Sequence, residues 1–151
     1  MSHEPVLPPW SEMTGVEYVQ AMIAGTTPHS GMHGVIPMRC VAAAPGYAKF
    51  IARADPHHTN PAGPVHGGFA ATVLDSVTAC AIHTTLAAGV HATTIDLHVK
   101  YLRPVPVALE LIAEATTTNL SRRLGVADGT LRDATGKLYA QATVTCLILR
   151  E

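Results

Sequence analysis

The stretch that decides the fold is His66-Gly67-Gly68-Phe69-Ala70-Ala71-Thr72-Val73-Leu74-Asp75-Ser76-Val77-Thr78-Ala79-Cys80-Ala81-Ile82-His83. Its length and composition predict one long helix over residues 66–83 that opens on two glycines. Apolar residues occupy almost every side of this helix, which is typical of a helix in the middle of a fold. We therefore expect the rest of the chain to wrap around it.

One carboxylate, Asp75, interrupts this apolar helix. None of the residues three or four positions away from it is basic, so no ion pair within the helix can hold its charge. A buried, unpaired carboxylate is costly or takes up a proton. Asp75 is therefore expected to find a partner elsewhere or to line a cavity, and its small neighbours leave room for a ligand.

The spacing between Gly67 and Asp75 indicates a site shared between two chains. The two residues are eight positions apart, which is roughly 12 Å along a helix axis. They cannot both touch one small reacting group. If the exposed amides at the helix start polarise a carbonyl, a carboxylate acting beside that carbonyl must come from a second copy of the helix. The sequence thus predicts a homodimer with its sites between subunits.

The composition of the chain limits its class and its partners. Its 151 residues are expected to form one domain, residues 1–151, that buries a core without metals or disulfides. Hydrophobic residues make up 48% and charged residues 14%, which favours an oligomer. A net charge of −1 without basic runs argues against nucleic acid or a membrane as partner. Because no signal peptide or long apolar run is present, we expect a soluble, cytoplasmic protein.

The sequence carries no sign of metal, serine or cysteine chemistry. The three cysteines are scattered and form no CxxC pair, and the histidines lack a His-Glu-x-x-His or comparable spacing. We therefore expect no metal site. There is no Gly-x-Ser-x-Gly elbow, and Cys80 on the buried helix is expected to be inert packing.

The chain before the central helix predicts an arm, a first helix and two strands. Residues 1–34 form the N-terminal arm and helix, in which Thr14-Gly15-Val16-Glu17 has the form of a capping box and Gly25 ends the helix. Residues 5–10 are expected to be irregular, with Trp10 as an anchor, and residues 26–34 to be a loop. Strands are predicted at roughly 35–44 and 47–54, with a turn at Pro45-Gly46.

The chain after the central helix predicts four more strands. The first alternates Ile95, Leu97, Val99 and Tyr101 with polar residues and ends at Pro104, so it should be half-buried. The others are expected around 109–115, 123–132 and 138–149. Strands in short-turn succession pair antiparallel. The predicted fold class is therefore α+β, an antiparallel sheet wrapped around a long central helix, with an extra N-terminal helix.

Three segments form a pattern that is specific in combination. They are Asn60-Pro61-Ala62-Gly63-Pro64-Val65-His66-Gly67-Gly68, Leu74-Asp75-Ser76 and Thr93-Thr94-Ile95-Asp96-Leu97-His98-Val99-Lys100-Tyr101-Leu102-Arg103-Pro104. With Gly136-Lys137-Leu138-Tyr139-Ala140, this pattern resembles the hotdog-fold acyl-CoA thioesterases, specifically the phenylacetate-pathway (PaaI-like) branch. The resemblance spans most of residues 35–149. It implies hotdog dimers, often paired into a homotetramer, that hydrolyse acyl- or aroyl-CoA; coenzyme A is then part of the substrate and no separate cofactor is expected.

The resemblance also implies roles for individual residues. Gly67 would offer its backbone N–H to the thioester carbonyl, and Asn60 would help to set that side of the site. Asp75 would come from the partner subunit as nucleophile or general base, and the Thr94 hydroxyl would hold the attacking water. Strict alternation points Thr93 rather than Thr94 at the helix, so this last role requires a bulge. His66 is expected to orient or cap the helix start.

Coenzyme A brings phosphates that need local cations. The candidates are Arg103, Arg122, Arg123 and Lys137. Of these, Arg122 and Arg123 belong to Ser121-Arg122-Arg123, which resembles a segment that meets the nucleotide in relatives. Gly68, beside the amide of Gly67, is a further expected contact of the coenzyme A moiety.

Plainer interpretations and other functions stay open at this point. Asp75 could bond a backbone amide or a strand arginine, and the two glycines could only allow close packing at a helix start. The first functional hypothesis is hydrolysis of an aryl- or medium-chain acyl-CoA. The second is an acyl-CoA hydratase or dehydratase that uses His66 with Asp75 as an acid/base pair, and the third is a non-catalytic acyl-CoA-binding module.

Overall fold

The computed structural model describes residues 8–27 and 30–150, so residues 5–7 of the predicted arm lie outside the described residues. The elements in chain order are η1 (Trp10–Glu12), α1 (Gly15–Ile23), α2 (Gly31–Val35), β1 (Met38–Ala44), β2 (Tyr47–Arg53), η2 (Pro56–His58), α3 (Gly67–His83), β3 (His91–Tyr101), β4 (Glu110–Leu120), β5 (Leu124–Asp133) and β6 (Leu138–Leu149). None of the described helices is long and apolar enough to cross a lipid bilayer.

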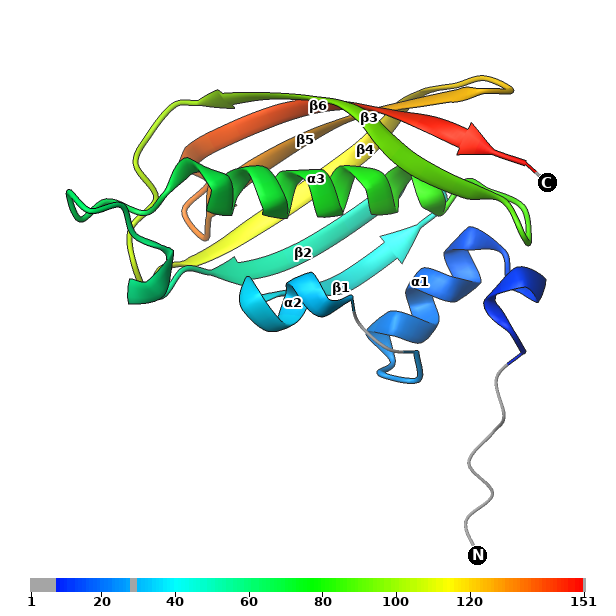
Figure 1. The fold of residues 1–151 in the computed structure, drawn as a ribbon, viewed down its shortest axis with the longest axis horizontal. Helices are drawn as coiled ribbons and strands as arrows, with labels where there is room; N and C mark the ends of the chain where they lie inside the picture. The colour runs from blue at the N-terminus through cyan, green and yellow to red at the C-terminus, as the bar shows by residue number, and fades with distance from the viewer. Residues whose placement is uncertain (1–7, 28–29, 151) are drawn as a thin grey trace, which may run out of the picture.

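The strands form one antiparallel sheet that curves around α3, as Figure 1 shows. The six strands lie in the order β1-β2-β4-β5-β6-β3, and α3 packs against every one of them. The α+β architecture predicted from the sequence is therefore confirmed. Because β1 and β3 are the two outer strands, each has one edge without a neighbour among the described residues of this chain.

Two glycines in β5 allow α3 to lie close to the sheet. A Cβ added to Gly129 would be 2.8 Å from Cγ2 of Thr78, and one added to Gly125 would be 2.6 Å from Cγ2 of Ile82. Thr78 and Ile82 are one helical turn apart, so consecutive turns of α3 rest on bare backbone. The core beneath the helix is then filled by Val73, Leu74 and other fully buried side chains.

The first helix follows its sequence signals. The Thr14 hydroxyl accepts a hydrogen bond from the Glu17 amide at 3.4 Å, and the Glu17 carboxylate accepts one from the Thr14 amide at 2.8 Å, which completes the predicted capping box. The helix ends at Ile23, before Gly25 adopts a φ of +73°. Its buried residues Val19 and Met22 join the main core.

The segment before the first strand differs from the expectation. The predicted loop over residues 26–34 contains most of a short helix, α2, and β1 begins only at Met38 rather than near residue 35. Trp10, expected to be irregular, begins the single turn η1. A five-residue helix containing two glycines has too few apolar positions to show a helical period, so the pattern could not reveal it.

Strand β3 carries a bulge and is more exposed than predicted. Its pairing with β6 skips from Thr94 to Asp96, so Ile95 is an extra residue without an opposite partner. Ile95, Leu97 and Tyr101 are 56%, 36% and 55% exposed, which corrects the expectation of a half-buried strand. The physical reason is that β3 ends the sheet, so no described strand of this chain covers its outer side.

Candidate active site at the start of the central helix

The first turn of α3 is held by His66. The Nδ1 atom of His66 accepts a hydrogen bond from the Gly68 amide at 2.8 Å, and its carbonyl accepts one from the Phe69 amide at 3.0 Å. A Cβ on Gly68 would lie 2.9 Å from this same Nδ1 atom, so the cap requires glycine there. His66 therefore caps the helix, which is the orienting position expected from the sequence.

The backbone amide of Gly67 takes no part in these capping hydrogen bonds. No described residue accepts a hydrogen bond from it, as expected for the first residue of a helix. It lies on the wall of a hollow of about 340 Å³ that Tyr101, Arg103 and Val105 also line. A Cβ on Gly67 would be 3.2 Å from the Tyr101 ring, so a side chain here would enter the hollow. A donor at the positive end of a helix is suited to bind a carbonyl oxygen.

Asn60 belongs to a closed turn that leads into this helix start. Its amide donates to the Pro64 carbonyl at 2.7 Å, and its own carbonyl accepts from the Gly63 amide at 2.9 Å. Thr59 and Val65 form an antiparallel bridge across the turn. The backbone of Asn60 thus fixes the loop in front of His66, while its proposed side-chain role stays a prediction.

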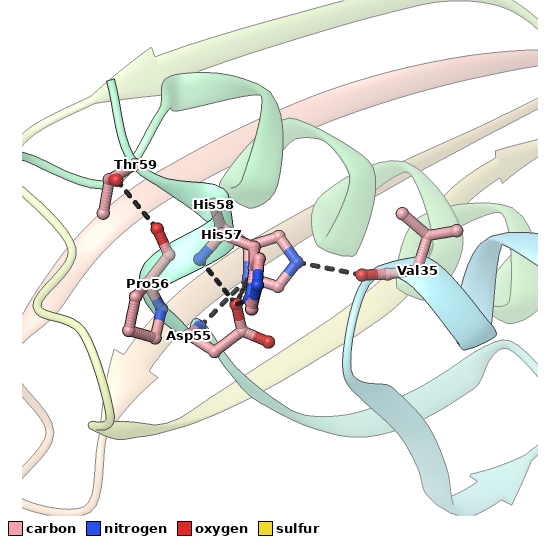
Figure 2. A network of polar contacts seen from close by, with 6 residues as sticks. All are labelled: Val35, Asp55, Pro56, His57, His58 and Thr59. Atoms are coloured by element: carbon pink, nitrogen blue, oxygen red, sulfur yellow. Dashed lines mark hydrogen bonds and ion pairs between the residues drawn. The ribbon is translucent and has the colours of Figure 1, made fainter. Parts of the chain in front are cut away.

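A network of polar contacts before the same turn, drawn in Figure 2, also holds it in place. Nε2 of His58 lies 2.9 Å from the Val35 carbonyl, and the His58 carbonyl accepts a hydrogen bond from the His66 amide at 2.7 Å. Asp55 caps η2 by accepting from the His57 amide at 2.8 Å, and this bond is the main cause of the lowered pKa of the Asp55 carboxyl. These contacts tie η2 and α2 to the beginning of α3.

Asp75 is half-buried in the middle of the helix and has one hydrogen-bond donor from another element. The Thr94 hydroxyl donates a hydrogen bond to Oδ1 of Asp75 at 2.9 Å. No arginine, lysine or histidine among the described residues forms an ion pair with this carboxylate. The bulge at Ile95 turns Thr94 toward the helix, because Thr94 now pairs with the buried Cys146 while Leu97 still pairs with the buried Val144.

The helix amide and the carboxylate that are predicted to act on the substrate therefore lie on one helix. Gly67 and Asp75 both belong to α3 and are separated by roughly 12 Å along its axis. Within the described part of this chain no aspartate or glutamate lines the hollow beside Gly67.

The candidate cations divide between two ends of the molecule. Nη1 of Arg103 donates to the Leu138 carbonyl at 2.7 Å beside the Gly67 hollow, and Nζ of Lys137 lies 5.6 Å from the ring centre of the neighbouring Tyr139. Arg122 and Arg123 line a different hollow on the β4–β5 turn, which approaches the far end of α3. Ser121 closes that turn, because its hydroxyl donates to the Leu124 carbonyl at 3.2 Å. The structure therefore does not bring the predicted set together within one chain.

Sequence reasoning missed two contributors to these surfaces. Tyr101 forms the wall opposite Gly67, and its position follows from the alternation that places Val99 and Tyr101 on the helix side of β3. Arg150 lines the hollow of Arg122 and Arg123, and its Nε donates to the Arg122 carbonyl at 3.2 Å. No sequence signal distinguishes Arg150 from a solvated terminal residue.

Other nucleophiles are unsuited to this site. Burial raises the pKa of the Cys80 thiol to about 12, so at neutral pH it is protonated and a poor nucleophile. Within residues 8–27 and 30–150, histidine, cysteine, aspartate and glutamate side chains do not gather in groups that could hold a metal ion. The chemistry available here is that of a carboxylate, a hydroxyl and a helix amide.

The chain matches a known protein family. The family model described as the thioesterase superfamily matches residues 62–140. Acyl-coenzyme A thioesterase 13 of Homo sapiens is 30% identical over 106 residues, which are 70% of this chain and 75% of that protein.

The fold of this chain is also similar to the folds of solved structures. The crystal structure of a phenylacetic acid degradation-related protein from Ralstonia eutropha JMP134 has a TM-score of 0.79 and 30% identity, covering 86% of this chain and 98% of that one. A Streptococcus mutans protein bound to acetyl-CoA shares the fold at a TM-score of 0.69 and 21% identity, over 76% of this chain and 90% of that one.

The matched residues 62–140 contain the start of α3, Asp75 and Thr94 together, which are the features that define the site described above. The chain therefore belongs to the thioesterase superfamily and is a thioester hydrolase with the hotdog fold.

Proposed function

We propose that the protein hydrolyses aryl- or medium-chain acyl-CoA thioesters at sites shared between two subunits. Two groups carry this proposal. One is the backbone amide of Gly67, which lines the hollow, and the other is the carboxylate of Asp75, which accepts a hydrogen bond from Thr94. Both groups suit thioester hydrolysis, and one chain alone cannot apply them to the same carbonyl. The relatives named for acyl-CoA hydrolysis and phenylacetic acid degradation support the same class of substrate.

The unpaired edge of β3 supports the pairing of two chains. Ile95, Leu97 and Tyr101 are exposed apolar side chains along this edge, where a copy of the strand can add by main-chain hydrogen bonds. Gly67 lies against Tyr101, and Asp75 accepts a hydrogen bond from Thr94. Antiparallel pairing about an axis between Leu97 and His98 would set Tyr101 opposite Thr94 of the partner subunit. That register brings Gly67 toward Asp75 of the partner subunit.

The proposed reaction uses each group once. The thioester oxygen accepts a hydrogen bond from the Gly67 amide, which stabilises the negative charge that develops there. Asp75 of the partner subunit, oriented by Thr94, takes a proton from water as the water oxygen bonds to the carbonyl carbon. The carbon–sulfur bond then breaks, and the departing thiolate receives the proton that Asp75 took from water, which restores the carboxylate. The products are a carboxylic acid and free coenzyme A.

We assign the polar end of coenzyme A to the cations beside the hollow. Arg103 and Lys137 flank the Leu138–Tyr139 backbone at the end of the sheet where α3 begins. Other candidate contacts of coenzyme A are Gly68 at the start of α3 and, on the turn between β4 and β5, Ser121, Arg122 and Arg123. Guanidinium and ammonium groups are the usual partners of phosphates.

Release of a free thiol tests this function directly. Purified protein is mixed with phenylacetyl-CoA and octanoyl-CoA, and the thiol is followed with a chromogenic reagent. Hydrolysis gives one thiol for each carboxylic acid formed. A hydratase or dehydratase that pairs His66 with Asp75 would change the acyl chain and release no thiol, and a binding module would leave the thioester intact.

The Thr94 hydroxyl offers a graded test of how Asp75 works. Because Thr94→Val removes the only described side-chain donor to this carboxylate, we expect kcat to fall about tenfold, as for loss of one hydrogen bond to a charged group. Thr94→Ser should restore most of the rate. Thr143→Val is a matched control, since Thr143 donates to Asp128 at 2.6 Å on the exposed face. A kcat for Thr94→Val equal to that of the control would exclude the role.

A further inference from the structure

The hydroxyl group of Tyr101 lies beside the first residue of the central helix. Tyr101 is the last residue of β3, and its ring lines the same hollow as Gly67. A Cβ placed on Gly67 would be 3.2 Å from the ring atoms Cε1 and Cζ and 3.4 Å from the hydroxyl oxygen. The hydroxyl end of the ring, rather than its Cβ end, therefore lies against the helix start.

The Tyr101 hydroxyl and the Gly67 amide are close enough to share one acceptor. In standard backbone geometry a Cβ lies about 2.5 Å from its own nitrogen, so the hydroxyl oxygen lies within about 6 Å of the Gly67 nitrogen, and nearer unless the three atoms are in line. Hydrogen bonds of about 2.9 Å from an N–H and about 2.7 Å from an O–H let donors up to about 5.6 Å apart meet at one oxygen atom. A single carbonyl oxygen in the hollow can therefore accept from both.

The Tyr101 hydroxyl is also the side-chain donor that the hollow leaves unused. Among the described residues that line this hollow, the polar side chains are those of His66, Tyr101 and Arg103. His66 uses Nδ1 to cap the helix, and Arg103 donates to the Leu138 carbonyl. No described residue forms a hydrogen bond with the Tyr101 hydroxyl. It is thus available to a ligand in the hollow.

The backbone around Tyr101 is held in place by several hydrogen bonds. Tyr101 pairs with Ala140 of β6. The amides of the next two residues, Leu102 and Arg103, both donate to the Tyr139 carbonyl, at 2.9 and 3.1 Å. A donor that is already in position stabilises developing charge better than one that must first reorient. The end of β3 therefore presents the hydroxyl as a fixed donor.

We propose that the Tyr101 hydroxyl is a second donor to the thioester oxygen, beside the Gly67 amide, and is therefore a catalytic residue of the hydrolysis. The inference rests on the proposed function, because Gly67 must bind that oxygen. As the water oxygen bonds to the carbonyl carbon, one electron pair of the C=O bond moves to the thioester oxygen. Tyr101 keeps its proton and donates a stronger hydrogen bond to this negative charge. When the carbon–sulfur bond breaks, the C=O bond forms again.

Replacement of Tyr101 by phenylalanine removes this hydroxyl and keeps the ring. We expect kcat for phenylacetyl-CoA to fall about a hundredfold, as for loss of one donor to the oxyanion, with KM and the mass of the assembly nearly unchanged. Tyr47→Phe is the matched control, because the Tyr47 hydroxyl donates to Glu114 at 2.6 Å on the face of the sheet away from α3. The control should keep the wild-type kcat. Equal kcat values for the two variants would overturn the proposal.

The carbonyl stretch of a bound thioester gives a readout that a merely structural role would not move. Phenylacetyl-CoA with an isotopic label at the thioester carbonyl is bound to Asp75→Asn protein and followed by difference infrared spectroscopy. Each hydrogen bond to the carbonyl oxygen lowers the frequency of this band. The band should therefore lie at a higher frequency in Tyr101→Phe/Asp75→Asn protein, and an identical band would overturn the assignment.

The two levels of inference fail in different ways. If wild-type protein hydrolyses no thioester, the proposed function is overturned and the role of Tyr101 with it. If wild-type protein hydrolyses phenylacetyl-CoA and Tyr101→Phe does so at the same rate, only the role of Tyr101 is overturned.

Discussion

Replacement of Asp75 by asparagine is expected to reduce thioester hydrolysis by about a thousandfold, within the range measured for loss of a general base. The asparagine keeps the shape of the side chain and can still accept the Thr94 hydrogen bond, but it cannot take a proton from water. Since the carboxylate forms no ion pair with a described residue, its neutralisation leaves no opposite charge unpaired. We therefore expect folding and assembly to be preserved.

The measurement is kcat/KM for phenylacetyl-CoA, with the melting temperature and the mass of the assembly determined on the same samples. Asp128→Asn is a matched control, because Asp128 also accepts a hydrogen bond from a threonine, Thr143, but on the outer face of the sheet. That variant should hydrolyse the substrate at the wild-type rate. Wild-type turnover by Asp75→Asn would remove the mechanism.

The central helix could be predicted well because local signals determine it. A histidine cap, two glycines and a continuous apolar run define α3, and the capping box at Thr14 defines α1. The turn at Pro45-Gly46 likewise falls between β1 and β2, where Gly46 has a φ of +76°. Each of these features depends on neighbours within a few residues.

Features that depend on distant partners could not be predicted in the same way. The bulge at Ile95 exists only because β3 pairs with β6, and it alone turns Thr94 toward Asp75. The exposure of Leu97 follows from the position of β3 at the end of the sheet. Periodicity along one strand contains no information about either, so the sequence predicted burial for side chains that the fold leaves accessible.

The site residues show the same division. The predicted separation of Gly67 and Asp75 is found in the structure, because both residues belong to one helix. The candidate cations follow from their charge and from the resemblance of Ser121-Arg122-Arg123 to a segment that meets the nucleotide in relatives. Neither signal fixes their relative positions, and the topology separates Arg103 from Arg122 and Arg123. A further hollow, lined among others by Trp10, Tyr18 and His83, has no signal in the sequence, because it forms where η1, α1 and the start of β3 meet.

Mixing two inactive variants is expected to restore activity if each site takes Gly67 from one chain and Asp75 from the other. In Gly67→Val the new side chain meets the Tyr101 ring, whose atoms lie 3.2 Å from the Cβ position, and fills the space that the thioester oxygen must enter. In Asp75→Asn the base is lost. Dimers of either variant alone should be inactive, whereas a mixed dimer contains one intact site.

Random assortment makes half of the dimers mixed, each with one of its two sites intact, so co-expressed variants should recover about a quarter of the wild-type activity. The two chains carry different affinity tags, and the mixed dimer isolated through both tags should have about half of the wild-type kcat per dimer. Gly34→Ala, at a position where a Cβ would meet nothing within 4 Å, is the control for added bulk and should stay fully active.

The double variant Gly67→Val/Asp75→Asn provides the opposite test when it is mixed with wild-type chains. In a shared site, each site of a mixed dimer lacks either the amide or the carboxylate, so every wild-type chain paired with the double variant becomes inactive. At equal mixing the activity per wild-type chain should fall to about half. If Gly67 and Asp75 of one chain served the same site, wild-type chains would keep their full activity and the two single variants would not complement. Isolation of the mixed dimer in both experiments shows that the variant chains fold and assemble, so the activity of that dimer reports on the site itself.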